Sequence, residues 1–390
     1  MKQTHLDPYL LWFAAIQGIA PEKKIELHQH ISSIEHLYQR SDEEVTEISQ
    51  LIEHPLSELE LSILHGARFQ SISEIHNLPS ILEQHHIHVA LWNSHSYPTS
   101  LLDIASPPYA LYYKGALPLE SSASTAIVGA RRCTAYGESQ ALEFSESLAE
   151  KGVQIISGLA YGIDSFGHRG ALNGGGKTYA ILGCGVDICY PRSNIGLYSN
   201  ILEEGGGIIS EYPPGTPPLH YHFPQRNRII SALSDVVLVM EAKAKSGSLI
   251  TVDVALEQGK EVFALPGPIH SALSQGCNQL IRQGAGILLS TEQLMDDMSM
   301  INEKWEVLSP NYKEKQKSIN CHDIKLQETY IEDMDADSSL ISLLQGGPKT
   351  TEQLHSITGI PIQELISQLM TLSLGGKIRE IARGCYMHVR

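Results

Sequence analysis

Short, mostly apolar runs recur through the middle of the chain and are separated by longer amphipathic stretches. The runs are residues 125–129, 153–157, 178–183, 207–210, 236–240, 262–265 and 286–290. Most of the stretches between them have helical length and period, as in ESQALEFSESLAEKG. Strands that are apolar on both faces and alternate with helices indicate a parallel sheet covered by helices on both sides. The pattern therefore predicts an α/β fold with a doubly wound, mostly parallel sheet.

The two ends of the chain have different patterns. Residues 1–95 contain short amphipathic helical segments, and the first two are separated by Gly18 and Pro21, as in a helical hairpin. Residues 299–337 are polar and predict a flexible linker. Residues 338–390 predict three short helices followed by an alternating hairpin, the outline of a winged helix. The sheet domain then occupies residues 96–298.

Charge and composition narrow the class of protein. The 390 residues carry a formal net charge of -16, but the excess of acid lies mainly in residues 1–125, and residues 126–285 hold 12 basic and 14 acidic groups. The electrostatic potential near the binding surface, not the total charge, decides whether a phosphate backbone is attracted. The acidic total is therefore evidence against nucleic-acid binding but does not exclude it. No apolar run approaches the ~20 residues of a membrane helix. Six cysteines without a CxxC pair favour a reducing cytoplasm.

Polar or glycine-rich loops follow each predicted strand of the sheet domain. Because crossovers are right-handed, the carboxyl ends of parallel strands meet at one edge, where α/β sheets bind ligands. Backbone N–H groups at helix starts and nearby arginines attract anions. The loops thus predict a phosphate pocket formed by Gly129, Arg131, Ser157, Gly158, Gly162, Asp164, Arg192, Arg226, Asn227, Arg228, Ser246, Gly247 and Ser248. We interpret Asp164 as a hydrogen-bonding or capping residue rather than a catalytic base.

Motifs for nucleotide cofactors, metals and catalysis are incomplete. GGGKT (174–178) lacks the first P-loop glycine and precedes a strand, and GCGVDI lacks the third glycine of a dinucleotide site. The histidines at 85, 86 and 88 have no partner set at ligand spacing. No GxSxG elbow or paired carboxylates stand out. We therefore expect a binding site without cofactor, metal or catalytic group.

Six segments resemble one bacterial protein family when they are taken together. They are YPTSLLDIASPPYALYYKG, AIVGARRCTAYG, SGLAYGIDSFGHRGAL, AILGCGVDICYPRSN, SEYPPGTPPLHYHFPQRNRIISALS and SGSLITVDVALEQGKEVFALPG, followed by GCNQLIRQGA. Their order and content are similar to the DprA/Smf family, DNA processing protein A, over residues 97–286. The resemblance implies an extended Rossmann-like domain with a helical, SAM-like N-terminal domain and a winged helix. It also implies a homodimer that binds single-stranded DNA and loads RecA recombinase onto it in natural transformation and recombination.

The resemblance also assigns roles to residues. Arg131 and Arg192 would hold phosphates, Phe223 and the two arginines of RNR would line the same pocket, and Asn227 would lie near the bases or orient the loop. This chain departs from the family at His220, where a lysine is frequent, and at Tyr221, where a tryptophan is. The predicted winged helix carries few cations, which favours a protein-contact module over a reader of duplex DNA.

The segment FPQRNRIISA places two arginines, Arg226 and Arg228, near the predicted start of a helix. A helix N-terminus disfavours cations, so Arg226 and Arg228 need an anion nearby. We expect one arginine to face the pocket and the other to brace the loop through an internal pair. Two other functions stay open. One is a nucleotide hydrolase like the lysine-decarboxylase-like phosphoribohydrolases, whose PGGxGT loop is missing here, and the other is a nucleotide sensor that signals through the winged helix.

Overall fold

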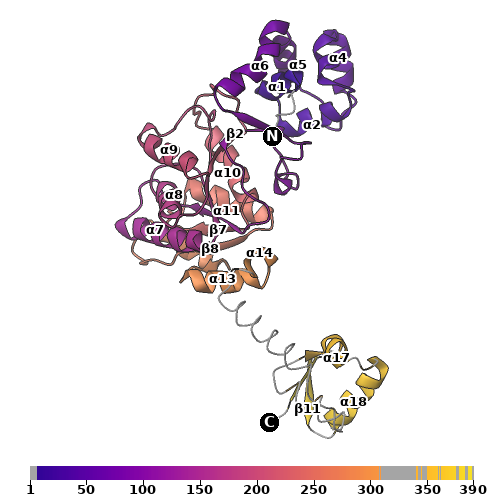
Figure 1. The fold of residues 1–390 in the computed structure, drawn as a ribbon, viewed down its shortest axis with the longest axis vertical. Coiled ribbons are helices and arrows are strands. Elements are labelled where there is room, and N and C mark those ends of the chain that lie inside the picture. Colours follow the sequence, from indigo (N-terminus) through magenta and orange to yellow (C-terminus); the bar gives the residue numbers. More distant parts are fainter. Residues whose placement is uncertain are drawn as a thin grey trace. The chain divides into compact units, whose positions relative to one another are not determined.

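The computed structural model describes residues 7–306 and 308, and near the C-terminus residues 340, 344, 349–358, 360, 362–374, 377–382 and 385–388. The chain divides into two compact units, Met1–Glu314 and Lys315–Arg390 (Figure 1). The first unit contains a helical region and a large sheet with its covering helices. The second unit is small and has a core of its own.

A nine-stranded sheet forms the centre of the first unit, in the order β1-β2-β6-β5-β4-β3-β7-β8-β9. The strands are β1 (His88–Leu91), β2 (Ala110–Gly115), β3 (Ser124–Val128), β4 (Gln154–Ser157), β5 (Thr178–Ile181), β6 (Gly207–Ser210), β7 (Val236–Val239), β8 (Glu261–Ala264) and β9 (Gly286–Ile287). Strands β3 to β9 pair in parallel, whereas β1 and β2 are antiparallel. The prediction of a mostly parallel sheet is confirmed, and its seven predicted strands are the parallel ones.

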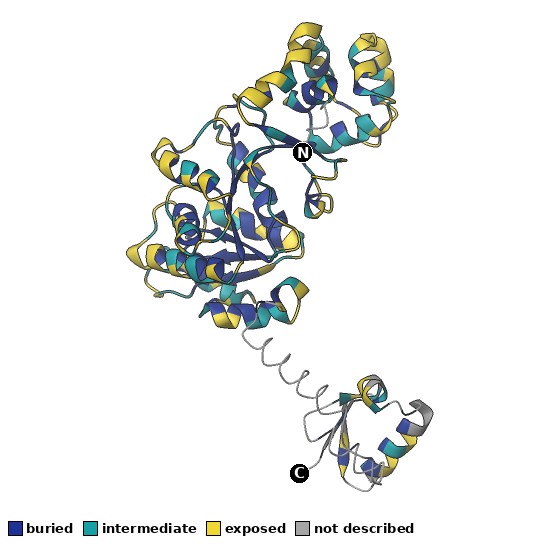
Figure 2. Ribbon diagram, in the orientation of Figure 1, coloured by how far each residue is buried: buried dark blue, intermediate teal, exposed yellow. Residues whose placement is uncertain are grey.

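Helices cover both faces of this sheet. They are α7 (Ala135–Glu150), α8 (Ile163–Asn173), α9 (Ile195–Glu203), α10 (His222–Ala232), α11 (Gly247–Glu257), α12 (Gln275–Arg282) and α13 (Thr291–Ser299), with 3-10 turns at Thr99–Leu101 and Arg192–Asn194. Apolar side chains of α10, α11 and α12 pack on one face, and those of α7, α8 and α13 pack on the other. Figure 2 shows the resulting pattern, with buried strands inside helices whose outer faces are exposed.

The strand order changes direction at β3. Successive strands β4, β5 and β6 lie to one side of β3, and β7, β8 and β9 lie to the other. Loops that leave the carboxyl ends of β3 and β7 therefore run to opposite sides and open a crevice between them. Open α/β sheets bind their ligands at such a point, so the topology places the expected site between β3 and β7.

Six helices precede the sheet. They are α1 (Pro8–Ala15), α2 (Pro21–Gln29), α3 (Ile34–Gln39), α4 (Asp42–Ser49), α5 (Glu58–Ala67) and α6 (Ile72–Gln84). Reciprocal capping boxes begin α4, α5 and α6, where a serine at the N-cap pairs with a glutamate three residues later. The predicted break between the first two helices is confirmed. One part of the predicted helical range differs, because residues 88–91 form β1 and pair with β2.

The start of the predicted linker is folded. Residues Glu303–Glu306 form a short helix, α14, and Trp305 is completely buried among side chains of the sheet domain. Its indole Nε1 donates to Asp235 Oδ2 at 3.2 Å, and Lys304 Nζ lies 3.0 Å from Asp235 Oδ1. The prediction of a flexible linker is wrong for this segment. It was based on the polar composition around NEKW, in which Trp305 is the one large apolar side chain. Most of the remaining predicted linker lies outside the described residues.

The second unit contains a small sheet and two helices in its described part. The elements are β10 (Lys349–Thr350), α17 (Thr351–Thr358), α18 (Ile362–Leu374), β11 (Ile378–Ala382) and β12 (Cys385–His388), with strand order β10-β12-β11. Buried leucines, Ile378 and Tyr386 form its core. The first predicted helix of this region lies outside the described residues except for Leu340 and Leu344. In the part of the chain that is described, no helix combines the length and apolar character needed to cross a membrane.

Candidate nucleic-acid interface

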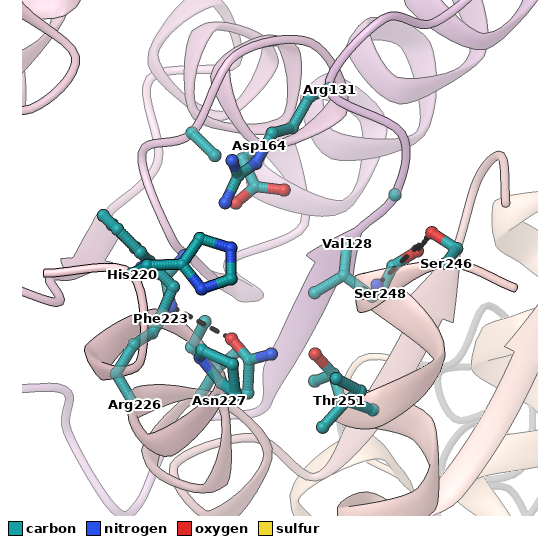
Figure 3. A pocket seen from close by; sticks show the side chains of 16 residues that line it. Val128, Arg131, Asp164, His220, Phe223, Arg226, Asn227, Ser246, Ser248 and Thr251 are labelled. Carbon is teal, nitrogen blue, oxygen red and sulfur yellow. Dashed lines mark hydrogen bonds between the residues drawn. The ribbon is translucent and has the colours of Figure 1, made fainter.

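A cavity of about 400 Å³ opens at the point where β3 and β7 adjoin (Figure 3). Its walls are the end of β3, the loop between β4 and α8, the start of α10 and the start of α11. Ten of the predicted site residues line it: Gly129, Arg131, Asp164, His220, Phe223, Arg226, Asn227, Ser246, Gly247 and Ser248. Segments up to about 120 residues apart in the sequence therefore meet where the strand order predicts a ligand site.

Arg131 and Phe223 form the rim of this cavity. The guanidinium carbon of Arg131 lies 5.5 Å from the centroid of the Phe223 ring, within the range of a cation–π contact. The exposed ring of Tyr190 lies 5.5 Å from the same ring. Among the described residues, Arg131 has no carboxylate at ion-pair distance, although Asp164 lies nearby (Figure 3). The rim thus offers an exposed cation beside an aromatic surface.

A buried carboxylate fixes the loop that carries Arg131. Glu241 follows β7 and is 2% exposed. It accepts hydrogen bonds from Thr134 N at 2.8 Å and Thr134 Oγ1 at 2.6 Å, at the start of α7. A carboxylate is stabilised at a helix N-terminus, both by the free N–H groups and by the helix dipole. The start of α7, and with it the loop from residue 129, is therefore held against the end of β7.

Two predicted glycines allow close packing of the loops. A side chain at Gly129 would come within 2.6 Å of Ile163, and one at Gly162 would come within 2.3 Å of the carbonyl oxygen of Ala130. Gly162 also has φ of +72°, which other residues adopt rarely. Gly129 borders the cavity and Gly162 does not. Both residues bring the loops after β3 and β4 together, which a larger residue would prevent.

Arg226 lines the cavity, but its guanidinium is bonded to the fold. The residue is 4% exposed. Its Nη1 donates to the carbonyl oxygens of Gly158, at 2.8 Å, and Ile181, and its Nε donates to Asn227 Oδ1 at 3.0 Å. Burial lowers the pKa of Arg226, and the charge of Asp164 opposes that effect. Arg226 therefore braces the ends of β4 and β5, and Gly158 contacts this guanidinium instead of lining the cavity.

Arg228 lies outside this cavity, contrary to the expectation from the resemblance. Its Nη1 and Nη2 each lie 2.7 Å from an oxygen of Glu211, in a bidentate pair, and its Nε donates to Ser106 O at 2.9 Å. Both side chains of the pair are largely buried. The expected internal brace is therefore present, and Arg228 provides it through a carboxylate whereas Arg226 does so through backbone carbonyls.

Asp164 and Ser157 have structural bonds. Burial raises the pKa of Asp164, and this is opposed by the charge of Arg226 and by backbone hydrogen bonds from Ala160 and Gly158. The hydrogen-bonding role expected for Asp164 agrees with these contacts. Ser157 is fully buried, and its hydroxyl donates to Ile127 O at 2.6 Å, which ties β4 to β3. Ser157 does not line the cavity.

The start of α11 closes the cavity opposite α10. Ser246 is the N-cap of this helix, and its hydroxyl lies 2.6 Å from that of Ser248 and 3.4 Å from the Ser248 amide (Figure 3). Ser246, Gly247 and Ser248 thus place the N-terminus of a helix at the cavity wall, where backbone N–H groups favour an anion. This is the arrangement that the sequence predicted for the fifth loop.

Comparison with known proteins identifies the family. The DNA recombination-mediator protein A family matches residues 88–299. Protein Smf of Escherichia coli is 37% identical over 339 residues, which cover 86% of this chain and 87% of that protein. The chain belongs to this family. DNA processing protein DprA of Streptococcus pneumoniae is 44% identical over 199 residues, covering 51% of this chain and 70% of that protein.

A solved structure has the same fold. The X-ray structure of DprA from Streptococcus pneumoniae aligns with a TM-score of 0.62 at 33% identity, and it covers 76% of this chain and 98% of that one. The expected DprA/Smf membership is thus confirmed by sequence and by structure. The α/β architecture with a helical region before the sheet agrees with it.

Arg192 is another predicted site residue that does not line the cavity. It begins the 3-10 turn after β5, is exposed, and has no ion-pair partner in the described part of the chain. The turn is fixed by Asn194, whose side-chain amide donates to Leu159 O at 2.9 Å and Ser165 Oγ at 2.8 Å. The loop around Arg192 does meet the rim, because the Tyr190 ring contacts Phe223.

Sequence reasoning missed several residues of this site. Val128, Ala160, Pro224, Ile230, Ile250 and Thr251 also line the cavity. Most are apolar and their pattern predicted only core positions. Lys243 and Lys245 do not line the cavity, but they are exposed in the loop directly before the Ser246 cap. Their position between a buried strand and a helix start is a signal in the sequence that marks them as further candidates.

Proposed function

We propose that this chain binds single-stranded DNA at the cavity between β3 and β7 and acts as a recombination mediator that loads RecA onto the strand. The observation that supports it most directly is Arg131, an exposed cation that forms no salt bridge among the described residues and lies over the Phe223 ring. Single strands need cations for phosphates and flat surfaces for bases. The helix start at Ser246 adds backbone N–H groups for a second phosphate.

The function requires no reaction chemistry. Asp164 is engaged in hydrogen bonds, and burial lowers the pKa of His168, four residues later, to about 3, so that its ring is neutral. We therefore propose binding without catalysis and without a cofactor. Incubation with nucleoside monophosphates tests this directly, because release of free base would favour the phosphoribohydrolase function instead.

Substitution of Arg131 tests the binding site. Arg131→Ala is expected to weaken binding of fluorescent oligothymidine by about tenfold in anisotropy titrations, and to reduce the slope of log affinity against log salt by ~0.7, the value for one phosphate contact on a single strand. Arg132→Ala is the matched control, because Arg132 is the exposed neighbour that does not line the cavity. Equal effects of the two variants, or unchanged binding by Arg131→Ala, would contradict the proposal.

A second copy of the chain is part of this proposal. The last strand of the sheet, β9, lies at its edge, and Ile269, Ile287 and Leu289 are exposed there or in the adjoining loops, by 77%, 44% and 61%. Such residues favour a homodimer contact. Leu289→Glu is expected to shift the chain toward monomer in sedimentation velocity, with single-strand binding measured in parallel.

The C-terminal unit has a separate role in this proposal. We propose that residues 338–390 form a winged helix that contacts a protein partner, and that the chain works in the cytoplasm where RecA and incoming strands meet. The exposed side chains of α18 include Ile366 and Met370 and no described cation. A chain that ends at residue 314 should retain oligothymidine binding, and loss of RecA-dependent strand coating by that variant would support a protein-contact role.

A further inference from the structure

A second cavity of about 750 Å³ lies between the helical region and the sheet domain. The connection from α1 to α2 forms one wall, and the loop after β6 and the start of α10 form the other. The first turns of α10 separate this cavity from the one at β3 and β7. His220, Phe223 and Asn227 line the first cavity, whereas Tyr221, Gln225 and Arg228 line the second.

The second cavity has a buried lysine beyond its internal ion pair. Arg228 and Glu211 neutralise one another through their bidentate contact. Lys24 is 5% exposed and donates to the carbonyl oxygens of Ala14, at 3.1 Å, and Ile16. Burial lowers the pKa of Lys24 to about 7, and the charge of Glu211 opposes that effect. An anion bound in the cavity would act in the same direction as Glu211 and favour the protonated lysine.

Flat side chains and amides form much of the wall around this charge. The rings of Tyr212 and His222 are stacked with centroids 3.8 Å apart. Tyr221 is 59% exposed, and its ring meets His222 at an angle of 77°. Gln17 and Gln225 bring side-chain amides to opposite walls. Aromatic surfaces and amides are the groups that hold unpaired bases.

We propose that the second cavity holds the next nucleotides of the same single strand, which crosses the start of α10 over Tyr221. This inference rests on the proposed function of the first cavity. Three observations favour a continuous strand as occupant: the two cavities share α10, the exposed ring of Tyr221 lines the second cavity directly after His220 of the first, and a bound phosphate would favour the protonated form of Lys24. The strand therefore has a footprint that includes both the sheet domain and the helical region.

Oligonucleotide length separates the two cavities in an experiment. A short oligothymidine of about four nucleotides and a long one of about fifteen, both within the site sizes of single-strand binders, are titrated against the full chain by anisotropy. Tyr221→Ala is expected to weaken binding of the long strand about tenfold and of the short strand less than twofold. Phe69→Ala is the control, since Phe69 is an exposed aromatic residue of the helical region that lines neither cavity.

Other outcomes overturn the inference in distinguishable ways. If Tyr221→Ala binds the long strand like the parent, or weakens both lengths equally, the second cavity does not hold the continuing strand. If thymidine monophosphate raises the melting temperature of the parent but not of Tyr221→Ala, and length has no effect, the cavity is a mononucleotide site instead. If the parent binds neither strand, or Arg131→Ala changes neither affinity, the proposed function itself fails.

Discussion

The loop after β3 and the start of α10 place arginines around one cavity in opposite environments. Arg131 is exposed and contacts an aromatic ring, whereas Arg226 is buried and bonded to two carbonyl oxygens. Both follow the carboxyl end of a parallel strand, Arg131 in the loop before α7 and Arg226 in the first turns of α10. An arginine at such a position can therefore serve a ligand or the fold, and the acceptors within its reach decide which.

The available acceptors differ for a physical reason. Gly158 lies just beyond β4, and Ile181 ends β5, where carbonyl groups run out of ladder partners. A buried carbonyl needs a donor, and the guanidinium of Arg226 supplies one to each. At the start of α7, Thr134 is bonded to Glu241 instead, so the carboxylate nearest to that helix start is already occupied. Arg131 forms no salt bridge among the described residues and is exposed.

Removal of Arg226 should give the largest effect. Arg226→Ala leaves two buried carbonyls and Asp164 without their partner, and we expect a loss of about 3–5 kcal/mol in the free energy of unfolding. Arg131→Ala should change stability by less than about 0.5 kcal/mol. Urea denaturation followed by tryptophan fluorescence measures both. Equal free energies of unfolding for the two variants would contradict the assignment of Arg226 to the fold and Arg131 to the ligand.

The pair of Arg228 with Glu211 should show strong coupling. Each single alanine variant leaves one buried charge without its counter-ion, and the double variant removes both. We expect a coupling free energy of about 2–3 kcal/mol from a double-mutant cycle of denaturation curves. Lys151 and Glu292 form an exposed pair that serves as the reference, with a coupling below about 1 kcal/mol. Similar values for the two pairs would contradict a buried brace.

His168 reports on the charge of Arg226. Burial, and then the charge of Arg226, lower the pKa of His168 to about 3, and its Nδ1 lies 2.6 Å from Thr178 Oγ1. The unfolded chain takes up a proton on His168 near pH 6.5, whereas the folded chain does so only near pH 3. The free energy of unfolding therefore decreases as the pH falls from 6.5 toward 3. The stability advantage of the parent over His168→Asn should be about 2 kcal/mol smaller at pH 5 than at pH 7. A constant difference would show that the ring is protonated alike in both states.

Arg192 should give the smallest effect. It is exposed near the rim but does not line the cavity. Arg192→Ala is expected to leave the denaturation midpoint unchanged and to weaken oligothymidine binding by about threefold, less than Arg131→Ala, because Arg131 lines the cavity and Arg192 does not. Anisotropy titrations of both variants in one buffer make the comparison. A larger loss for Arg192 would move the centre of the interface toward the turn after β5.

The fold was largely predictable because the parallel strands are continuous apolar runs. The seven runs from residue 125 to residue 290 correspond to the parallel strands, and glycine-rich loops marked their carboxyl ends. The antiparallel strand β1 was missed because residues 88–91 are short and adjoin a histidine-rich helical segment. Trp305 was missed because one buried ring in a charged segment changes composition very little.

The site was predictable as a set of loops but less so residue by residue. Composition shows that Arg226 and Arg228 follow a strand, but the acceptors that bury them, such as Ser106 and Glu211, come from elsewhere in the chain. The apolar wall residues, such as Ile250, have the same pattern as core residues. Tertiary contacts determine which acceptors bury the two arginines and which apolar residues line the cavity. A local sequence pattern contains neither kind of information.

The anchorage of α14 has a mechanical consequence. Asp235 precedes β7 and therefore lies at the amino end of that strand, opposite the cavity. Tension applied through residues beyond 306 would first load the ion pair of Lys304 and the buried indole of Trp305. The loops that line the cavity lie at the other edge of the sheet and would not carry this force. A pull on the C-terminal part of the chain would therefore leave the shape of the cavity unchanged.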